Sequence, residues 1–215
     1  MPARRSLPIN PLGDDALLIE LGAKVDTALN SRALAMAAAL QKRRGVREAL
    51  AGYSTVTVHY DPEQVSYAAL KTAIGKLTRE RPPAAPPGRL HRIPVAYDGP
   101  DLEETAHTLR LSVERLIELH TRPIYRVFMV GFVPGLAYLG PLPLELQLPR
   151  RRVPRTHVPA GSVAIAAAQT TIYPLPTPGG WHLLGHTDLK LFLPESDPPC
   201  LLRTGDRVKF FASKA

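Results

Sequence analysis

The chain has 215 residues, of which 45% are hydrophobic, and it carries a formal net charge of +8. This length and hydrophobic content favour one large or two small folded domains and exclude global disorder. A single cysteine, Cys200, excludes an internal disulfide framework and predicts a reducing, cytoplasmic environment. Dispersed charge and an aromatic content of 6% argue against a nucleic-acid interface. The sequence shows no signal peptide or membrane-spanning segment.

The sequence predicts a small α+β domain of the ferredoxin-like kind for residues 1–80, because a strand, a helix, one or two strands and a second helix follow one another there. In residues 54–60, polar and apolar side chains alternate, which is typical of a half-buried strand. Ser66 is expected to cap a helix with Leu70, Ile74 and Leu77 on one face. The expected elements are a strand at 16–21, a helix at 30–43, strands at 46–51 and 54–60, and a helix after 66.

Residues 81–90 predict a linker between two domains. Four prolines occur between Arg81 and Gly88. Proline cannot continue a helix and favours extended polyproline conformation. We therefore place a domain boundary in this segment.

Residues 91–215 predict a mainly β domain, closed or nearly closed into a barrel. Two short helices, 101–109 and 113–121, are expected to begin after the capping residues Asp101 and Ser112. Short strands separated by Pro and Gly turns are typical of a barrel. The expected strands are 92–96, 125–130, 162–166, 170–173, 181–184, 189–193 and 207–211.

Several kinds of catalytic or binding motif are absent from the sequence. It contains no G-x-x-x-x-G-K-[ST] phosphate loop, no G-x-G-x-x-G after a strand and no G-x-S-x-G elbow. It also has no H-E-x-x-H, C-x-x-C or carboxylate cluster, so we expect no metal site. Cys200, in an apolar setting, is interpreted as a packing residue.

The segment 153–187 is the first candidate for a working surface, since rigid turns there carry polar and aromatic side chains. Arginine binds carboxylate or phosphate by a two-point contact, and glutamine offers a donor and an acceptor to an amide. The alternative for each polar group is that its side chain forms hydrogen bonds with the backbone of a turn. For His120, the alternative is a purely structural role near the C-terminus of a helix. The candidate binding residues are Arg155, His157, Ser162, Gln169, Tyr173, Trp181 and His120.

A second set of residues is expected to form the wall of a pocket. The segment 131–140 turns sharply after a strand, and 178–181 is a tight turn that presents Trp181. The alternative is a hydrophobic corner of the barrel. The wall residues are Phe132, Pro134, Gly135, Tyr138, Pro159, Gly161, Gly179 and Gly180.

Three segments together resemble one protein family. They read G-F-V-P-G-L-A-Y-L-G (131–140), V-P-R-T-H-V-P-A-G-S-V-A-I-A (153–166) and Q-T-T-I-Y-P-L-P-T-P-G-G-W-H-L-L-G (169–185). They are similar to the KipI-like family, also called the B subunit of 5-oxoprolinase or allophanate hydrolase subunit 1, whose module is the carboxyltransferase domain, subdomains C and D. The family pattern differs at Ala167, Ala168 and Thr171, where glycine is usual, and at His186-Thr-Asp188, where Arg-Thr-Pro is usual.

The resemblance implies a cyclophilin-like fold for the barrel and a cytoplasmic enzyme subunit that is inactive alone. The implied reaction is the ATP-dependent opening of 5-oxoproline to L-glutamate, with ATP shared among subunits. The implied partners are a homologous C subunit, similar to allophanate hydrolase subunit 2, and a third subunit. The ligand would be a small amide or carboxylate. The alternatives are a KipI-like inhibitor of a sensor histidine kinase and a component of an amide or urea carboxyltransferase.

Overall fold

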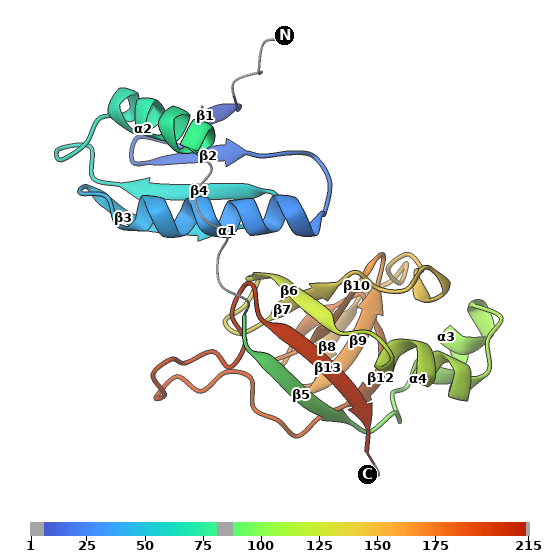
Figure 1. Ribbon diagram of the computed structural model, residues 1–215. Helices are drawn as coiled ribbons and strands as arrows, with labels where there is room; N and C mark the ends of the chain where they lie inside the picture. Colours follow the sequence, from blue (N-terminus) through green and yellow to red (C-terminus); the bar gives the residue numbers. More distant parts are fainter. Residues whose placement is uncertain (1–6, 81–87, 214–215) are drawn as a thin grey trace, which may run out of the picture. The chain divides into compact units, whose positions relative to one another are not determined.

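The computed structural model describes residues 7–80 and 88–213 (Figure 1). The chain divides into two compact units, Met1–Pro87 and Gly88–Ala215, each with its own hydrophobic core. The predicted linker at 81–90 lies mostly outside the described residues, and a strand of the second unit already begins at Leu90.

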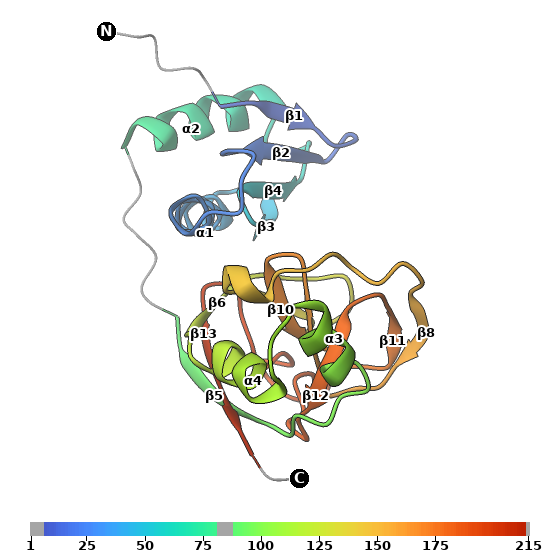
Figure 2. The ribbon, with the colours of Figure 1, turned by 90° about the vertical axis from the view of Figure 1, so that its right-hand side faces the viewer.

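The first unit is an antiparallel sheet of strand order β1-β2-β4-β3 with two helices. Figure 2 shows both helices on the same face of this sheet, and their apolar side chains share one core with Val56 and Val58. Its elements are β1 (Ile9–Pro11), β2 (Ala16–Glu20), α1 (Thr27–Gln41), β3 (Val46–Ala51), β4 (Thr55–Tyr60) and α2 (Tyr67–Glu80).

The local sequence explains these elements. In β4, Val56, Val58 and Tyr60 are buried, while the alternate residues are half-exposed, as the alternation predicts. The Ser66 hydroxyl accepts a hydrogen bond from the N–H of Ala69 at 3.2 Å and so caps α2. Helix α1 begins three residues earlier than predicted, because Asp26 accepts from the N–H of Leu29. The short strand β1 was not predicted and precedes the expected order of elements.

The second unit is a seven-stranded sheet of order β12-β9-β10-β7-β6-β13-β5, beside a two-stranded ribbon of β11 and β8. The two edges of the large sheet meet where Ala96 and His186 exchange backbone hydrogen bonds of 2.9 and 2.8 Å, so the sheet is nearly closed. Its strands are β5 (Leu90–Val95), β6 (Tyr125–Val130), β7 (Ala137–Gly140), β8 (Arg155–Val158), β9 (Ser162–Ala166), β10 (Gln169–Ile172), β11 (Thr177–Gly179), β12 (His182–His186) and β13 (Arg207–Ala212).

Two short helices, α3 (Leu102–Thr108) and α4 (Val113–Thr121), lie beside each other at one end of this barrel (Figure 1). The Ser112 hydroxyl caps α4 by accepting from the N–H of Arg115. A one-turn helix, η1 (Leu144–Leu146), follows β7. Leu116 and Leu119 of α4 pack into the barrel core with Phe210 and Val127, all fully buried.

Three predictions for this unit were wrong in detail. Residues 189–193 form no strand and pair only through a bridge between Phe192 and Cys200. Strands β7, β8 and β11 were not predicted, because each has only three or four residues and is flanked or interrupted by Pro or Gly. Asp101 precedes α3, but its side chain makes no capping hydrogen bond.

Candidate functional site

The outer face of the barrel wall carries several of the predicted site residues. Thr170 of β10 points into the barrel, where its hydroxyl meets His120, so its neighbour Gln169 points outward. Tyr138 of β7 and Tyr173, which follows β10, lie in one cluster on this outer face. We call the strip of this face that runs from Gln169 past Tyr138 and Trp181 to Tyr173, at the other end of β10, the outer-face site.

The ribbon of β8 and β11 lies over this face and brings Trp181 onto it. The Trp181 ring lies 6.0 Å from the Tyr138 ring, tilted by 59°. Gly179 packs so closely on Tyr173 that a Cβ there would collide with the tyrosine hydroxyl. Tyr173 and Trp181 are only 2% and 7% exposed, so both chiefly fill the layer between ribbon and barrel.

Arg150 supplies positive charge to the outer-face site. Its guanidinium lies 5.9 Å from the centre of the Trp181 ring, within range of a cation–π contact. Burial raises the pKa of Tyr138, and the charge of Arg150 opposes this. Burial also raises the pKa of Tyr173. Both hydroxyls therefore stay protonated at neutral pH. The hydroxyl of Tyr138, which is half-buried, is able to donate to a carbonyl or carboxylate oxygen, whereas that of Tyr173 is covered by Gly179.

Arg155, a predicted ligand-binding residue, is engaged by a buried carboxylate. Its two terminal nitrogens donate to Asp101 at 2.9 and 2.6 Å. Arg151 and the backbone N–H of Leu183 also donate to Asp101, at 2.9 and 2.8 Å. Burial raises the pKa of Asp101, but the bonds to Arg155 and Leu183 and the two guanidinium charges outweigh it and hold the pKa below its usual value.

This network ties α3 to β8 and β12, and its Asp101 side chain is 2% exposed. The sequence identified Asp101 only as a helix cap, since no local pattern pairs it with arginines 50 and 54 residues away. Arg155 therefore orients the ribbon, and its charge is neutralised within the protein.

His120 lies inside the barrel, away from the outer-face site. Thr170 donates its hydroxyl hydrogen to the carbonyl of Ala164 at 3.0 Å, so it accepts from His120 Nε2 at 2.9 Å. Nδ1 then accepts from the hydroxyl of Tyr97 at 2.6 Å. Complete burial lowers the pKa of His120 to about 3, which keeps the imidazole neutral. The ring also stacks on Phe210, 4.8 Å away.

The remaining predicted residues are spread over the second unit. Gln169 pairs with Ala166, whereas Ser162 lies roughly 13 Å away at the other end of the β9–β10 hairpin, where its carbonyl accepts from the N–H of Tyr173 at 2.9 Å. Gly161 and Pro159 adjoin Ser162, and His157 is exposed on β8. Phe132, Pro134 and Gly135 form the β6–β7 connection. Gly180 lies against Pro154 of the arginine-containing loop.

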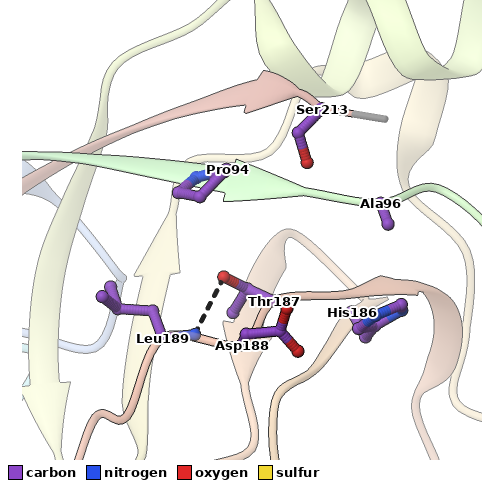
Figure 3. A pocket seen from close by; sticks show the side chains of 7 residues that line it. All are labelled: Pro94, Ala96, His186, Thr187, Asp188, Leu189 and Ser213. Atoms are coloured by element: carbon purple, nitrogen blue, oxygen red, sulfur yellow. Dashed lines mark hydrogen bonds between the residues drawn. The ribbon is translucent and has the colours of Figure 1, made fainter. Parts of the chain in front are cut away.

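A separate shallow depression of about 410 Å³ lies at the seam where the barrel closes (Figure 3). His186 is one of its lining residues, and its Nδ1 lies 2.9 Å from Asp98. Asp188 and the hydroxyls of Thr187 and Ser213 also line it, with Pro94, Ala96 and Leu189. Among the residues that the structure describes, no lysine or arginine lines the depression, so these residues are a poor match for a carboxylate or phosphate ligand.

Within residues 7–80 and 88–213, no three His, Cys, Asp or Glu side chains gather as they would around a metal ion. Over the same residues, no helix has the length and apolar character needed to span a lipid bilayer.

Comparison with known sequences identifies relatives that belong to one family. Residues 7–202 match the family model described as carboxyltransferase domain, subdomain C and D. The chain is 42% identical over 207 residues to the B subunit of 5-oxoprolinase of Escherichia coli O157:H7, and the match covers 94% of each chain. It is 39% identical over 218 residues to the B subunit of 5-oxoprolinase of Bacillus subtilis strain 168, with 94% of this chain and 91% of the relative covered.

Solved structures share the fold. TTHA0988 superposes with a TM-score of 0.84 at 40% identity over 93% of this chain, which spans only 40% of the length of TTHA0988. The urea amidolyase of K. lactis superposes with a TM-score of 0.75 at 18% identity over the whole of this chain, which spans 15% of that protein. The second similarity concerns the fold alone.

Proposed function

This chain belongs to the family of the carboxyltransferase domain, subdomain C and D, and we propose that it is the B subunit of an ATP-dependent 5-oxoprolinase. The observation that carries this proposal is the identity of about 40% to the B subunits of 5-oxoprolinases across 94% of this chain. The reaction converts 5-oxoproline, ATP and water into L-glutamate, ADP and phosphate. We assign the barrel to the cyclophilin-like type and the first unit to the ferredoxin-like type.

The chemistry requires activation of a lactam. Resonance makes its carbonyl carbon a poor electrophile. Phosphoryl transfer from ATP to the carbonyl oxygen releases ADP and makes the carbon reactive. A first water then adds to that carbon and the ring C–N bond breaks, which gives an acyl phosphate and a free amine. A second water adds to the acyl carbon, and phosphate leaves with the original carbonyl oxygen, which gives L-glutamate.

The outer-face site offers donors suited to this substrate. The hydroxyl of Tyr138 and the amide of Gln169 would donate to the lactam or carboxylate oxygens, and Arg150 would balance the negative charge. Donors held in place before the reaction stabilise charge that develops on the oxygen. Arg155 would act indirectly, by fixing the ribbon over this site through Asp101.

We propose that the site is completed by other subunits, because Tyr138 and Gln169 are only half-buried on the outer face. The chain contains no phosphate loop, so ATP would be held by, or shared with, a homologous C subunit and a third subunit. The B subunit alone would then be inactive.

Co-expression tests this proposal. We expect the three subunits to form a complex whose ATP hydrolysis is stimulated by 5-oxoproline and yields glutamate, whereas the isolated chain shows neither. A stable complex without stimulated turnover contradicts the proposal, and so does turnover that depends on a biotinylated carrier.

Tyr138→Phe tests the outer-face site directly. Loss of one donor to a developing oxyanion should lower kcat of the complex by about 10-fold or more. Tyr53→Phe, in the first unit, is the control and should leave kcat unchanged. If the two variants have equal kcat values in a steady-state ATPase assay, Tyr138 has no role in the reaction.

A further inference from the structure

The β6–β7 connection holds an aromatic residue in an unfavourable backbone conformation. Phe132 has φ of +76°, a region that bulky L-residues rarely occupy. Its side chain is nevertheless 69% exposed. The chain therefore accepts backbone strain at Phe132 without burying the ring in its own core, and strain of this kind is concentrated at functional sites.

The rest of the loop is firmly anchored. The N–H of Gly131 donates to the carbonyl of Leu136 at 3.0 Å, and the N–H of Leu136 donates to that of Val133 at 3.2 Å. Leu136 is buried in the aromatic cluster beneath the ribbon, and Val133 packs against it. Gly135 fits tightly beside the Cβ of Phe192. These contacts fix the loop so that Phe132 projects from it.

Phe132 precedes Val133, which packs on a cluster that contains aromatic residues and lies next to an arginine. The cluster that anchors Val133 also contains Tyr138 and Trp181, and Arg150 lies over Trp181. Aromatic residues and arginine are enriched where proteins meet. A partner that accepts the ring and complements Arg150 would present an apolar pocket with an acidic rim.

Related proteins favour a second polypeptide as the occupant. In TTHA0988, the part that matches this chain makes up 40% of one longer polypeptide. In that protein, the domains that match this chain are therefore covalently joined to additional polypeptide. A polypeptide that corresponds to this additional part is therefore the occupant we expect on the loop.

We propose that Phe132 is a docking anchor that inserts into an apolar, acid-rimmed pocket of the homologous C subunit. This inference rests on the proposed function and extends it, since it places the interface beside the outer-face site. The fixed position of the ring reduces the entropy lost on association.

The decisive variant is Phe132→Gly, which removes the ring and also relieves the backbone strain. We expect the Kd for the purified C subunit, measured by calorimetry, to rise by about 30-fold, as for an interface hot spot. The Tm of the isolated chain should rise, because glycine accepts a positive φ. Weaker binding by a more stable protein cannot result from misfolding.

Leu144→Ala is the matched control. Leu144 is also a large, exposed apolar residue, at 81%, but it has no positive φ. We expect its Kd to stay within about twofold of the wild-type value, since scattered exposed apolar residues are common on protein surfaces.

Several results would overturn the inference. One is that Phe132→Gly leaves the Kd for the C subunit unchanged. If that variant also loses turnover, Phe132 contacts the substrate instead of the C subunit. Disruption of a dimer of this chain by Phe132→Gly would identify a second copy as the occupant. If the wild-type chain does not bind the C subunit, both the proposed function and this inference fail. If 5-oxoproline stimulates turnover of the wild-type complex but Phe132→Gly leaves the Kd unchanged, only this inference fails.

Discussion

At the residue scale, two buried polar groups are stabilised in different ways. Asp101 is kept ionised by two arginines and a backbone N–H. His120 is kept neutral by complete burial and by partners that satisfy both ring nitrogens. Each group makes a distinct prediction about stability.

Asp101→Asn should destabilise the protein by about 3 kcal/mol, because it leaves Arg151 and Arg155 without their carboxylate in a partly buried setting. The surface pair of Asp15 and Arg47, in which both side chains are more than half exposed, provides the control. Asp15→Asn should cost less than about 1 kcal/mol. Urea unfolding of both variants at pH 7 measures the difference, and equal losses would show that the Asp101 network contributes nothing special.

His120 predicts a pH dependence of stability. The pKa of His120 in the folded state, about 3, lies below the ordinary value of 6.5. Between pH 3 and pH 6.5 the unfolded state therefore binds one more proton at this residue than the folded state does. Stability is therefore lost as the pH falls below about 6.5. Between pH 7.5 and pH 5 the loss from this group should be on the order of 2 kcal/mol.

The measurement compares the free energy of unfolding at the two pH values in His120→Gln and in the wild-type protein. We expect the pH dependence to become smaller in this variant, whatever its stability at pH 7.5. His107→Gln, which changes an exposed histidine of α3, should retain the wild-type dependence. An unaltered dependence in His120→Gln would show that another group causes it.

At the element scale, the β9–β10 hairpin positions the outer-face site. It carries Thr170 into the barrel and Gln169 onto the outer face, so its register decides which side chain meets a ligand. Its turn contains Ala167 at φ of +49°, a conformation that favours glycine.

Ala167→Gly should therefore stabilise the protein by about 0.5–1 kcal/mol, because relief of the strain exceeds the entropy gained by the unfolded chain. Ala168→Gly is the matched control, since Ala168 has no positive φ and should lose stability on the same substitution. Thermal unfolding distinguishes the two variants. Destabilisation by Ala167→Gly would mean that the turn is not strained.

At the scale of the whole molecule, each unit has a core drawn from its own residues. The buried residues of the first core lie between Leu17 and Ile74, and those of the barrel core between Ile93 and Phe210. We expect residues 88–215, expressed alone, to fold and to unfold cooperatively in urea. A gradual transition without near-ultraviolet circular dichroism would contradict this independence.

The sequence by itself determined the local features of this protein. The alternation in 54–60, the caps at Ser66 and Ser112 and the three segments that carry the family resemblance depend on residues close together in the chain. Local conformational preference and side-chain periodicity decide such features. For the same reason the family resemblance is visible in three continuous segments, without any tertiary contact.

Only the tertiary structure decided which distant residues meet. Asp101 binds Arg155, 54 residues away, and His120 reaches Thr170, 50 residues away. Closure of the barrel joins Ala96 to His186. These contacts depend on the path of the whole chain, which no local preference specifies. They determine which of the predicted polar residues support the fold and which remain available to a ligand.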